Sequence, residues 1–184
     1  YRLTAHLGLA IAIYAYIVWL TIGLFSPERQ HRDGALTSVF GIIGLVYLMI
    51  LSGGFVAGTN AGLSFPTWPL MGDSFIPPAL YREGVTSAFE QVTTIHFNHR
   101  MLAYITGAVL ITAAVHGLLI SKDRRLKLAS VLMLIAVCFQ IVLGISTVLS
   151  FVNPTIAAGH QSGAVVLLTT VLFWVHVFST QGAD

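Results

Sequence analysis

The fold of this chain is decided by stretches such as residues 126–150, which read LKLASVLMLIAVCFQIVLGISTVLS. This stretch is apolar almost throughout, and its one charged residue, Lys127, lies beside its start. A helix of about 20 apolar residues is long enough to cross the hydrocarbon layer of a membrane. Similar stretches run approximately over residues 3–25, 36–58, 102–120 and 157–178. We therefore predict five transmembrane helices.

The composition supports the same class of protein. Hydrophobic residues make up 56% of the chain, charged residues 9%, and the mean hydropathy is +0.85, a balance that excludes an ordinary soluble domain. The apolar runs are continuous rather than alternating, which favours helices over the strands of a membrane barrel. The predicted fold is thus all-α, a polytopic membrane helical bundle. The basic pI of about 8.9 suits an anionic inner leaflet, and we expect no nucleic-acid partner.

Basic residues predict the orientation of the bundle. Six of the nine lysines and arginines lie in two turns, residues 27–34 and 121–127, which we expect at the same end of the bundle. The positive-inside rule places these turns inside and the long connection 59–97 outside. This connection contains four of the six prolines, and we expect either an ordered cap or an interfacial loop anchored by Trp68 and Phe75.

Three histidines near the expected outer ends of helices begin similar pentapeptides, HLGLA at 6–10, HRMLA at 99–103 and HQSGA at 160–164. Each has a small residue one helical turn later, which leaves room for a flat macrocycle against the helix. His99 and His160 are 61 residues apart, a spacing that returns the chain to the same membrane depth. Two such imidazoles can occupy both axial positions of a haem iron.

Alternative roles for these side chains stay open at this point. A single intramembrane histidine is more often a hydrogen-bonded helix contact, but the matched pair favours ligation of haem iron, with Ala103 and Gly163/Ala164 beside the rings. Arg100 could pair with a haem propionate or with lipid phosphate. No residue is identified as a catalytic side chain.

The remaining histidines fit a metal site less well. A second, deeper haem would need His116 and His176 on the same helix faces as His99 and His160. His116 follows His99 by 17 residues and is rotated from it by about 100° about the helix axis, and His176 follows His160 by 16 residues and is rotated by about 160°. We therefore expect packing or interfacial roles. His96 could share a zinc ion with His99, but it lacks a third ligand at helical spacing.

Several motifs together resemble haem A synthase of the mitochondrial and alphaproteobacterial branch. The motifs are GGFVAGTNAGL at 53–63, FPTWPLM at 65–71, FNHR at 97–100, LGIST at 143–147 and GHQSG at 159–163. The resemblance covers nearly the whole chain. The branch lacks a cysteine pair in its outer loops, and this chain also has none there.

The resemblance implies an eight-helix protein made of two similar four-helix halves. Residues 1–25 would be a transmembrane helix of the N-terminal half, and residues 26–184 the C-terminal haem-b-binding bundle with outer loop 59–97. The start at Tyr1 indicates truncation, so the missing N-terminal helices would be partners of this chain. His99 and His160 would be the axial ligands of haem b, and His6 would bind the iron of the substrate haem.

The reaction implied by the resemblance is the oxidation of a haem O methyl group to a formyl group by successive hydroxylations. The expected partners are haem O and the lipid bilayer, with haem O synthase or oxidase assembly factors as candidate partner proteins. The expected location is the bacterial cytoplasmic membrane or the mitochondrial inner membrane, with the histidine motifs near the outer side.

Two other classes of function compete with this interpretation. A bis-histidine membrane cytochrome b acting only in electron transfer would use His99 and His160 equally well, but it leaves His6 and the proline-rich loop unexplained. A transporter that moves protons through intramembrane histidines would need polar groups along a path across the membrane, whereas the candidates here cluster at one surface.

Overall fold

The computed structural model describes residues 1–26 and 35–180 of the chain. Five described helices are long and apolar enough to cross a membrane, which confirms the predicted all-α membrane bundle. They are α1 (Arg2–Leu24), α2 (Ala35–Gly58), α4 (Val92–Ile120), α5 (Arg124–Leu149) and α6 (Pro154–Ser179). The described residues form no strand beyond one isolated bridge between Met71 and Ser74.

The start of α4 differs from the prediction. The helix begins at Val92, ten residues before the predicted apolar span and inside the predicted outer loop 59–97. Polar residues such as Thr94 and His96 lower the hydropathy of this part, but both are buried beneath the outer connection rather than exposed to lipid. His99 therefore lies about two turns inside its helix and not at its start.

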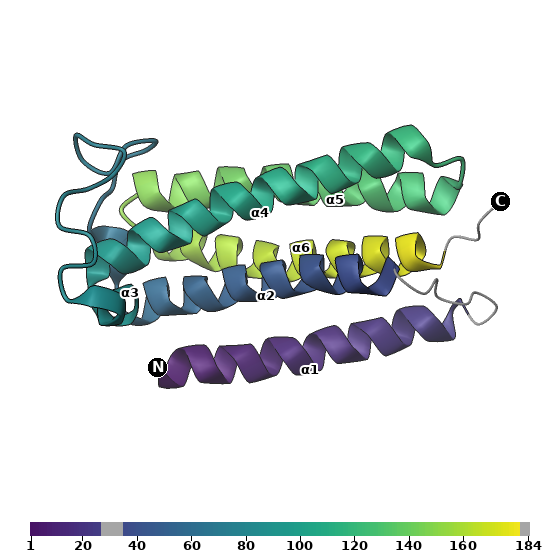
Figure 1. The fold of residues 1–184 in the computed structure, drawn as a ribbon, viewed down its shortest axis with the longest axis horizontal. Helices are drawn as coiled ribbons and strands as arrows, with labels where there is room; N and C mark the ends of the chain where they lie inside the picture. Colours follow the sequence, from purple (N-terminus) through teal and green to yellow (C-terminus); the bar gives the residue numbers. More distant parts are fainter. Residues whose placement is uncertain (27–34, 181–184) are drawn as a thin grey trace.

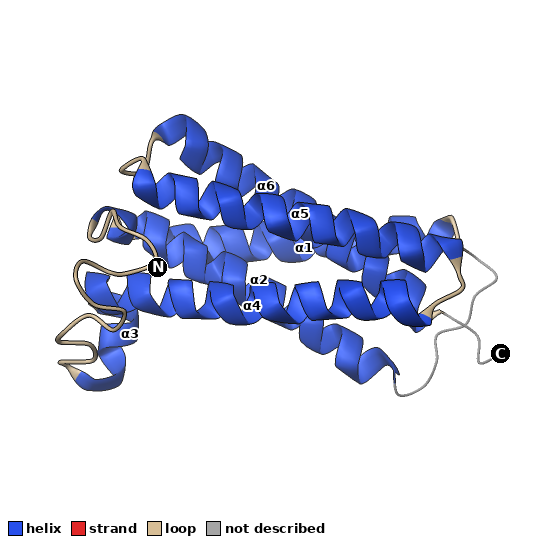
Figure 2. Ribbon diagram, turned by 90° about the horizontal axis from the view of Figure 1, so that it is seen from above, coloured by secondary structure: helices blue, strands red, loops and turns tan. Residues whose placement is uncertain are grey.

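Four helices form a ring, and the fifth lies outside it. Contacts join α2 to α4, α4 to α5, α5 to α6 and α6 to α2, so α4 and α6 are opposite members of the ring. Helix α1 lies along α2 and α6 on the outer surface of the ring (Figure 1). The view in Figure 2 shows the long helices running side by side between the two ends of the bundle.

Helix α1 contacts the ring along one face, which carries small, polar and apolar residues. Thr4, Gly8 and Ile11 are its buried residues. A Cβ atom on Gly8 would lie 2.9 Å from the Leu51 side chain, so glycine permits this close approach. The Tyr47 hydroxyl also donates a hydrogen bond to the Gly8 carbonyl over 3.1 Å. The opposite face of α1 has no packing partner among the described residues.

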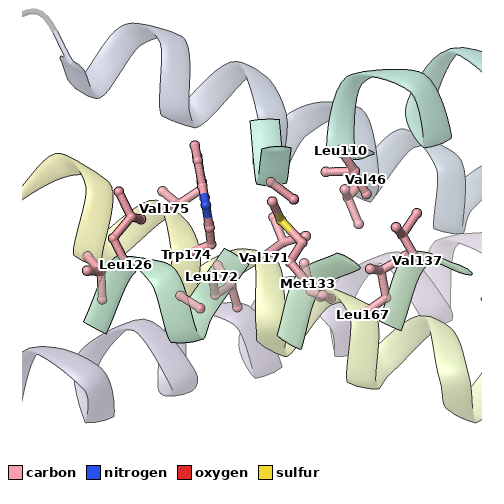
Figure 3. Packing of buried hydrophobic residues seen from close by; sticks show 14 of the residues in the cluster. Val46, Leu110, Leu126, Met133, Val137, Leu167, Val171, Leu172, Trp174 and Val175 are labelled. Carbon is pink, nitrogen blue, oxygen red and sulfur yellow. The ribbon is translucent and has the colours of Figure 1, made fainter. Parts of the chain in front are cut away.

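The apolar core occupies the half of the ring near the α4–α5 turn. Its labelled members interdigitate from α2, α4, α5 and α6 (Figure 3). In the other half of the ring, none of the residues from 138 to 149 in α5 or from 154 to 166 in α6 is buried. The bundle is therefore most buried at the end near the α4–α5 turn, and we call the other, less buried end the open end.

The connection from α2 to α4, residues 59–91, forms an ordered cap over the open end of the bundle (Figure 1). It contains the 3-10 helices η1 (Ala61–Leu63) and η2 (Gly84–Thr86) and the short helix α3 (Ser87–Glu90). The Thr67 hydroxyl donates to the Leu70 carbonyl over 2.8 Å and accepts from the Gly72 amide over 2.9 Å. Of the two expectations for this segment, these bonds favour the cap.

The described residues place the end of α1 and the start of α5 beside one another at one end of the bundle. Arg125 at the start of α5 donates to the Ser26 hydroxyl, just after α1, over 3.1 Å. The turn that carries Arg29 and Arg32 lies outside the described residues. The cap lies at the other end of the ring (Figure 1).

We predict that the cap faces the outside of the cell or organelle and the α4–α5 turn the inside. In a Cys138→Ala background, a cysteine at exposed Ser64 should react with a membrane-impermeant maleimide in intact cells. A cysteine at exposed Lys122 should react only after permeabilisation. The reverse pattern would overturn the orientation derived from the basic residues.

Candidate functional site

The structure brings His99 and His160 together at the open end of the ring. His99 comes from α4 and His160 from α6, and each lies about two turns after the start of its helix. Their rings are close enough to interact electrostatically. Both residues keep partial exposure. The pairing inferred from the 61-residue spacing is thus present in the fold.

Helix α2 supports the imidazole of His99. The Ser52 hydroxyl oxygen lies 2.7 Å from His99 Nδ1, within hydrogen-bond distance. Gly53 follows, and a Cβ atom there would lie 3.4 Å from Cε1 of the same ring, in contact with it. The serine bond and the flat glycine surface together fix the orientation of the ring.

Helix α5 supports the imidazole of His160. A Cβ atom on Gly144 would come within 3.0 Å of His160 Cε1, closer than an ordinary contact, so glycine here lets α5 approach the imidazole without displacing it. One turn earlier, Gln140 Nε2 donates to the His160 carbonyl over 3.0 Å. His160 Nδ1 is buried without a hydrogen-bond partner among the described residues. Packing against Gly144 thus holds this ring in place.

One small residue has a different role from the one predicted. Gly163 was expected to leave room for a macrocycle beside His160. Instead it lies against α5, where a Cβ atom would collide with the Gln140 side chain and come within 3.2 Å of Leu143. Its small size therefore permits close packing of α5 and α6. Ala103 and Ala164, one turn after the two imidazoles, are only partly buried.

The residues at the open end fit a haem. Haem iron bound by two histidines needs neutral imidazoles on opposite sides and an apolar space between them. The ring supplies one imidazole from each of two opposite helices, and the outer halves of α5 and α6 contain no buried residue. Two glycines, Gly53 and Gly144, bring the supporting helices against the imidazoles.

Arg100 is bound to the cap. Its Nε atom donates to His96 Nε2 over 3.1 Å, and its terminal nitrogens donate to the carbonyls of Leu70 over 3.2 Å and Phe65 over 2.8 Å. The side chain is only 7% exposed. Three of the five N–H groups of a guanidinium are used in this way. Sequence reasoning did not identify these partners, because backbone carbonyls of a loop leave no motif.

His96 bonds to Arg100, the residue that binds the cap. Its ring is 2% exposed, and Nε2 accepts the bond from Arg100. A neutral imidazole that accepts at Nε2 carries its hydrogen on Nδ1, so it has no free lone pair for a metal ion. The zinc site shared with His99, already disfavoured by the sequence, is further disfavoured by this bond.

The other histidines lie away from the pair. His6 is exposed on α1, on the helix face opposite Thr4 and Gly8. His116 is exposed at the far end of α4. His176 is 4% exposed, and its ring contacts Trp19 with a centroid distance of 5.1 Å.

Comparisons with known proteins agree on one family. The family model described as cytochrome oxidase assembly protein, COX15-CtaA, matches residues 1–172. A protein named heme A synthase from Nitrosospira multiformis is 42% identical over 183 residues, which cover 96% of this chain and 51% of that protein. Human heme A synthase COX15 is 40% identical over 181 residues, covering 94% of this chain and 44% of the relative. The chain thus spans about half the length of the curated relatives it matches.

We predict that Arg100 keeps the cap closed. Arg100→Met removes its bonds to the two cap carbonyls, and hydrogen bonds to charged groups contribute about 1.5–3 kcal/mol each. Chymotrypsin should then cleave the cap after Phe75, which is 48% exposed, at least about tenfold faster. Arg82→Met, at an exposed arginine of the same cap, is the control. Equal cleavage of both variants would show that Arg100 does not hold the cap.

Proposed function

The chain belongs to the COX15-CtaA family of cytochrome oxidase assembly proteins, and from this premise we propose that it is the haem-b-binding part of a haem A synthase. Such an enzyme oxidises a methyl group of haem O to a formyl group by successive hydroxylations. The observation that carries the proposal is the meeting of His99 and His160 at the open end of the ring. The proposed location is the inner membrane of a bacterium or mitochondrion, with the pair near the outer side.

In this proposal His99 and His160 are the axial ligands of haem b. Serine and glycine contacts from α2 orient the ring of His99, and contact with Gly144 of α5 orients the ring of His160. Held by both histidines, the haem would supply electron transfer rather than oxygen activation. The tightly packed far end of the ring keeps α4 and α6, the helices that carry the two histidines, at a fixed separation.

The cap has two proposed roles. Because Arg100 and Thr94 of α4 bond to the cap, the cap can exclude water from the open end of the ring. Arg100 has two further N–H groups beyond those bound to His96 and the cap, and we propose that they pair with a haem propionate. One guanidinium would then join the cap, α4 and the cofactor.

We propose that His6 is a ligand of the substrate haem O. Its side chain is exposed on the face of α1 that points away from the ring, so it cannot join the pair inside the ring. Ala10, one turn later, is also exposed and leaves this face flat near the imidazole. The matched region covers about half of each relative, and the rest of the substrate site would belong to the other half of such proteins.

The proposed axial ligands predict a spectroscopic result. The purified protein should carry one low-spin b-type haem, and His99→Ala or His160→Ala should abolish the low-spin optical spectrum because one axial bond is lost. His116→Ala should keep it, since this exposed histidine lies at the far end of α4. An unchanged low-spin spectrum at full occupancy in either of the first two variants would rule out the assignment.

If His6 binds the substrate haem, its loss should lower product formation without removing the low-spin haem. Mass spectrometry of the full-length protein incubated with haem O should detect hydroxylated and formyl products. His6→Ala should lower product formation at least about tenfold, while the low-spin haem stays in place. Leu9→Ala, at a 64% exposed neighbour on the same helix, should keep full activity. A wild-type protein that holds the haem but forms no product would favour the electron-transfer cytochrome instead.

A further inference from the structure

Ser52 makes two hydrogen bonds that share one hydroxyl group. Its Oγ atom donates to the Met49 carbonyl, three residues earlier in α2, over 2.9 Å. The same atom lies 2.7 Å from His99 Nδ1. A hydroxyl group has a single hydrogen, and a carbonyl oxygen can only accept. With its hydrogen directed at Met49, Ser52 can only accept from the imidazole.

The direction of this bond determines the tautomer of His99. A neutral imidazole carries one hydrogen, on either Nδ1 or Nε2. If Ser52 accepts at Nδ1, the hydrogen lies on Nδ1 and the lone pair on Nε2. Resting on the proposed function, we propose that Ser52 is a positioning residue that selects the Nδ1–H tautomer of His99 and directs the Nε2 lone pair at haem iron. Such partners of metal-bound histidines also raise the basicity of the ligand.

The second imidazole has no equivalent support. His160 Nδ1 is buried and has no hydrogen-bond partner among the described residues. Its ring is held by contact with Gly144, and the Gln140 bond reaches the backbone carbonyl rather than the ring. The two axial ligands are therefore unequal, with His99 the more basic donor. In a low-dielectric interior a single hydrogen bond of this kind has a large effect.

A purely structural role for Ser52 makes a different prediction. Serine and threonine side chains inside helices commonly donate to a carbonyl three or four residues earlier, with no partner beyond the helix. Thr170 does so in α6, where its hydroxyl donates to the Leu167 carbonyl over 2.8 Å. It lies in the same ring but contacts neither imidazole through a hydrogen bond. Thr170→Ala therefore reports the loss of a helix bond alone.

The test compares Ser52→Ala with the wild type in the haem-loaded protein. Loss of the acceptor makes His99 a weaker donor, which destabilises the ferric state and raises the midpoint potential. We expect a shift toward the ferrous state of about threefold to tenfold, up to ~59 mV for a one-electron couple. Haem affinity should fall roughly tenfold, as is usual for such partners of metal ligands. Thr170→Ala should change neither quantity.

Two further variants complete the experiment. Ser52→Thr retains a hydroxyl and should restore the wild-type potential. Ser52→Cys, whose sulfur is a weak acceptor, should raise the potential in the same direction as Ser52→Ala, and it serves as the test if the alanine variant does not accumulate. A wild-type potential and haem affinity in the alanine or the cysteine variant would overturn the role of Ser52. Absence of haem from the wild type would instead overturn the proposed function.

Discussion

The close approach of two helix backbones to two imidazoles is the constraint on which the rest of this structure depends. Gly53 of α2 lies against His99, and Gly144 of α5 lies against His160. Any side chain at Gly144 would push the imidazole away, because even a Cβ atom there would come within 3.0 Å of it. Each ring is thus positioned by a helix other than its own. The site exists only if all four helices of the ring keep their relative positions.

Different interactions hold the four helices in place at the two ends of the ring. At one end the apolar core packs α4, α5 and α6 together, and the Trp174 indole donates to the buried Ser130 hydroxyl over 2.8 Å. In a membrane such packing and interhelical bonding hold helices together, because lipid is as apolar as the core. At the other end the outer halves of α5 and α6 contain no buried residue, and the cap closes the ring through a buried arginine. Removal of that arginine would leave His96 and two loop carbonyls without their donor.

Much of this arrangement could be predicted from the sequence, because membrane spans and histidine spacing are local properties. The apolar runs predicted all five helices, and the 61-residue spacing predicted that His99 and His160 would meet. The predicted start of α4 was wrong because hydropathy cannot distinguish a buried polar helical turn from an exposed loop. The contacts of Ser52, Gly144 and Arg100 depend on which helices are neighbours, and no spacing within one helix encodes that. Glycine inside long apolar runs was the one available signal.

The central claim is that His99 and His160 together bind one haem iron inside the ring. An experimental density map of the haem-loaded protein tests it most directly. The account predicts a macrocycle at the open end of the ring, between α4 and α6, with iron at bonding distance from Nε2 of both histidines. A macrocycle bound elsewhere, or iron bonded to only one of the two imidazoles, would contradict it.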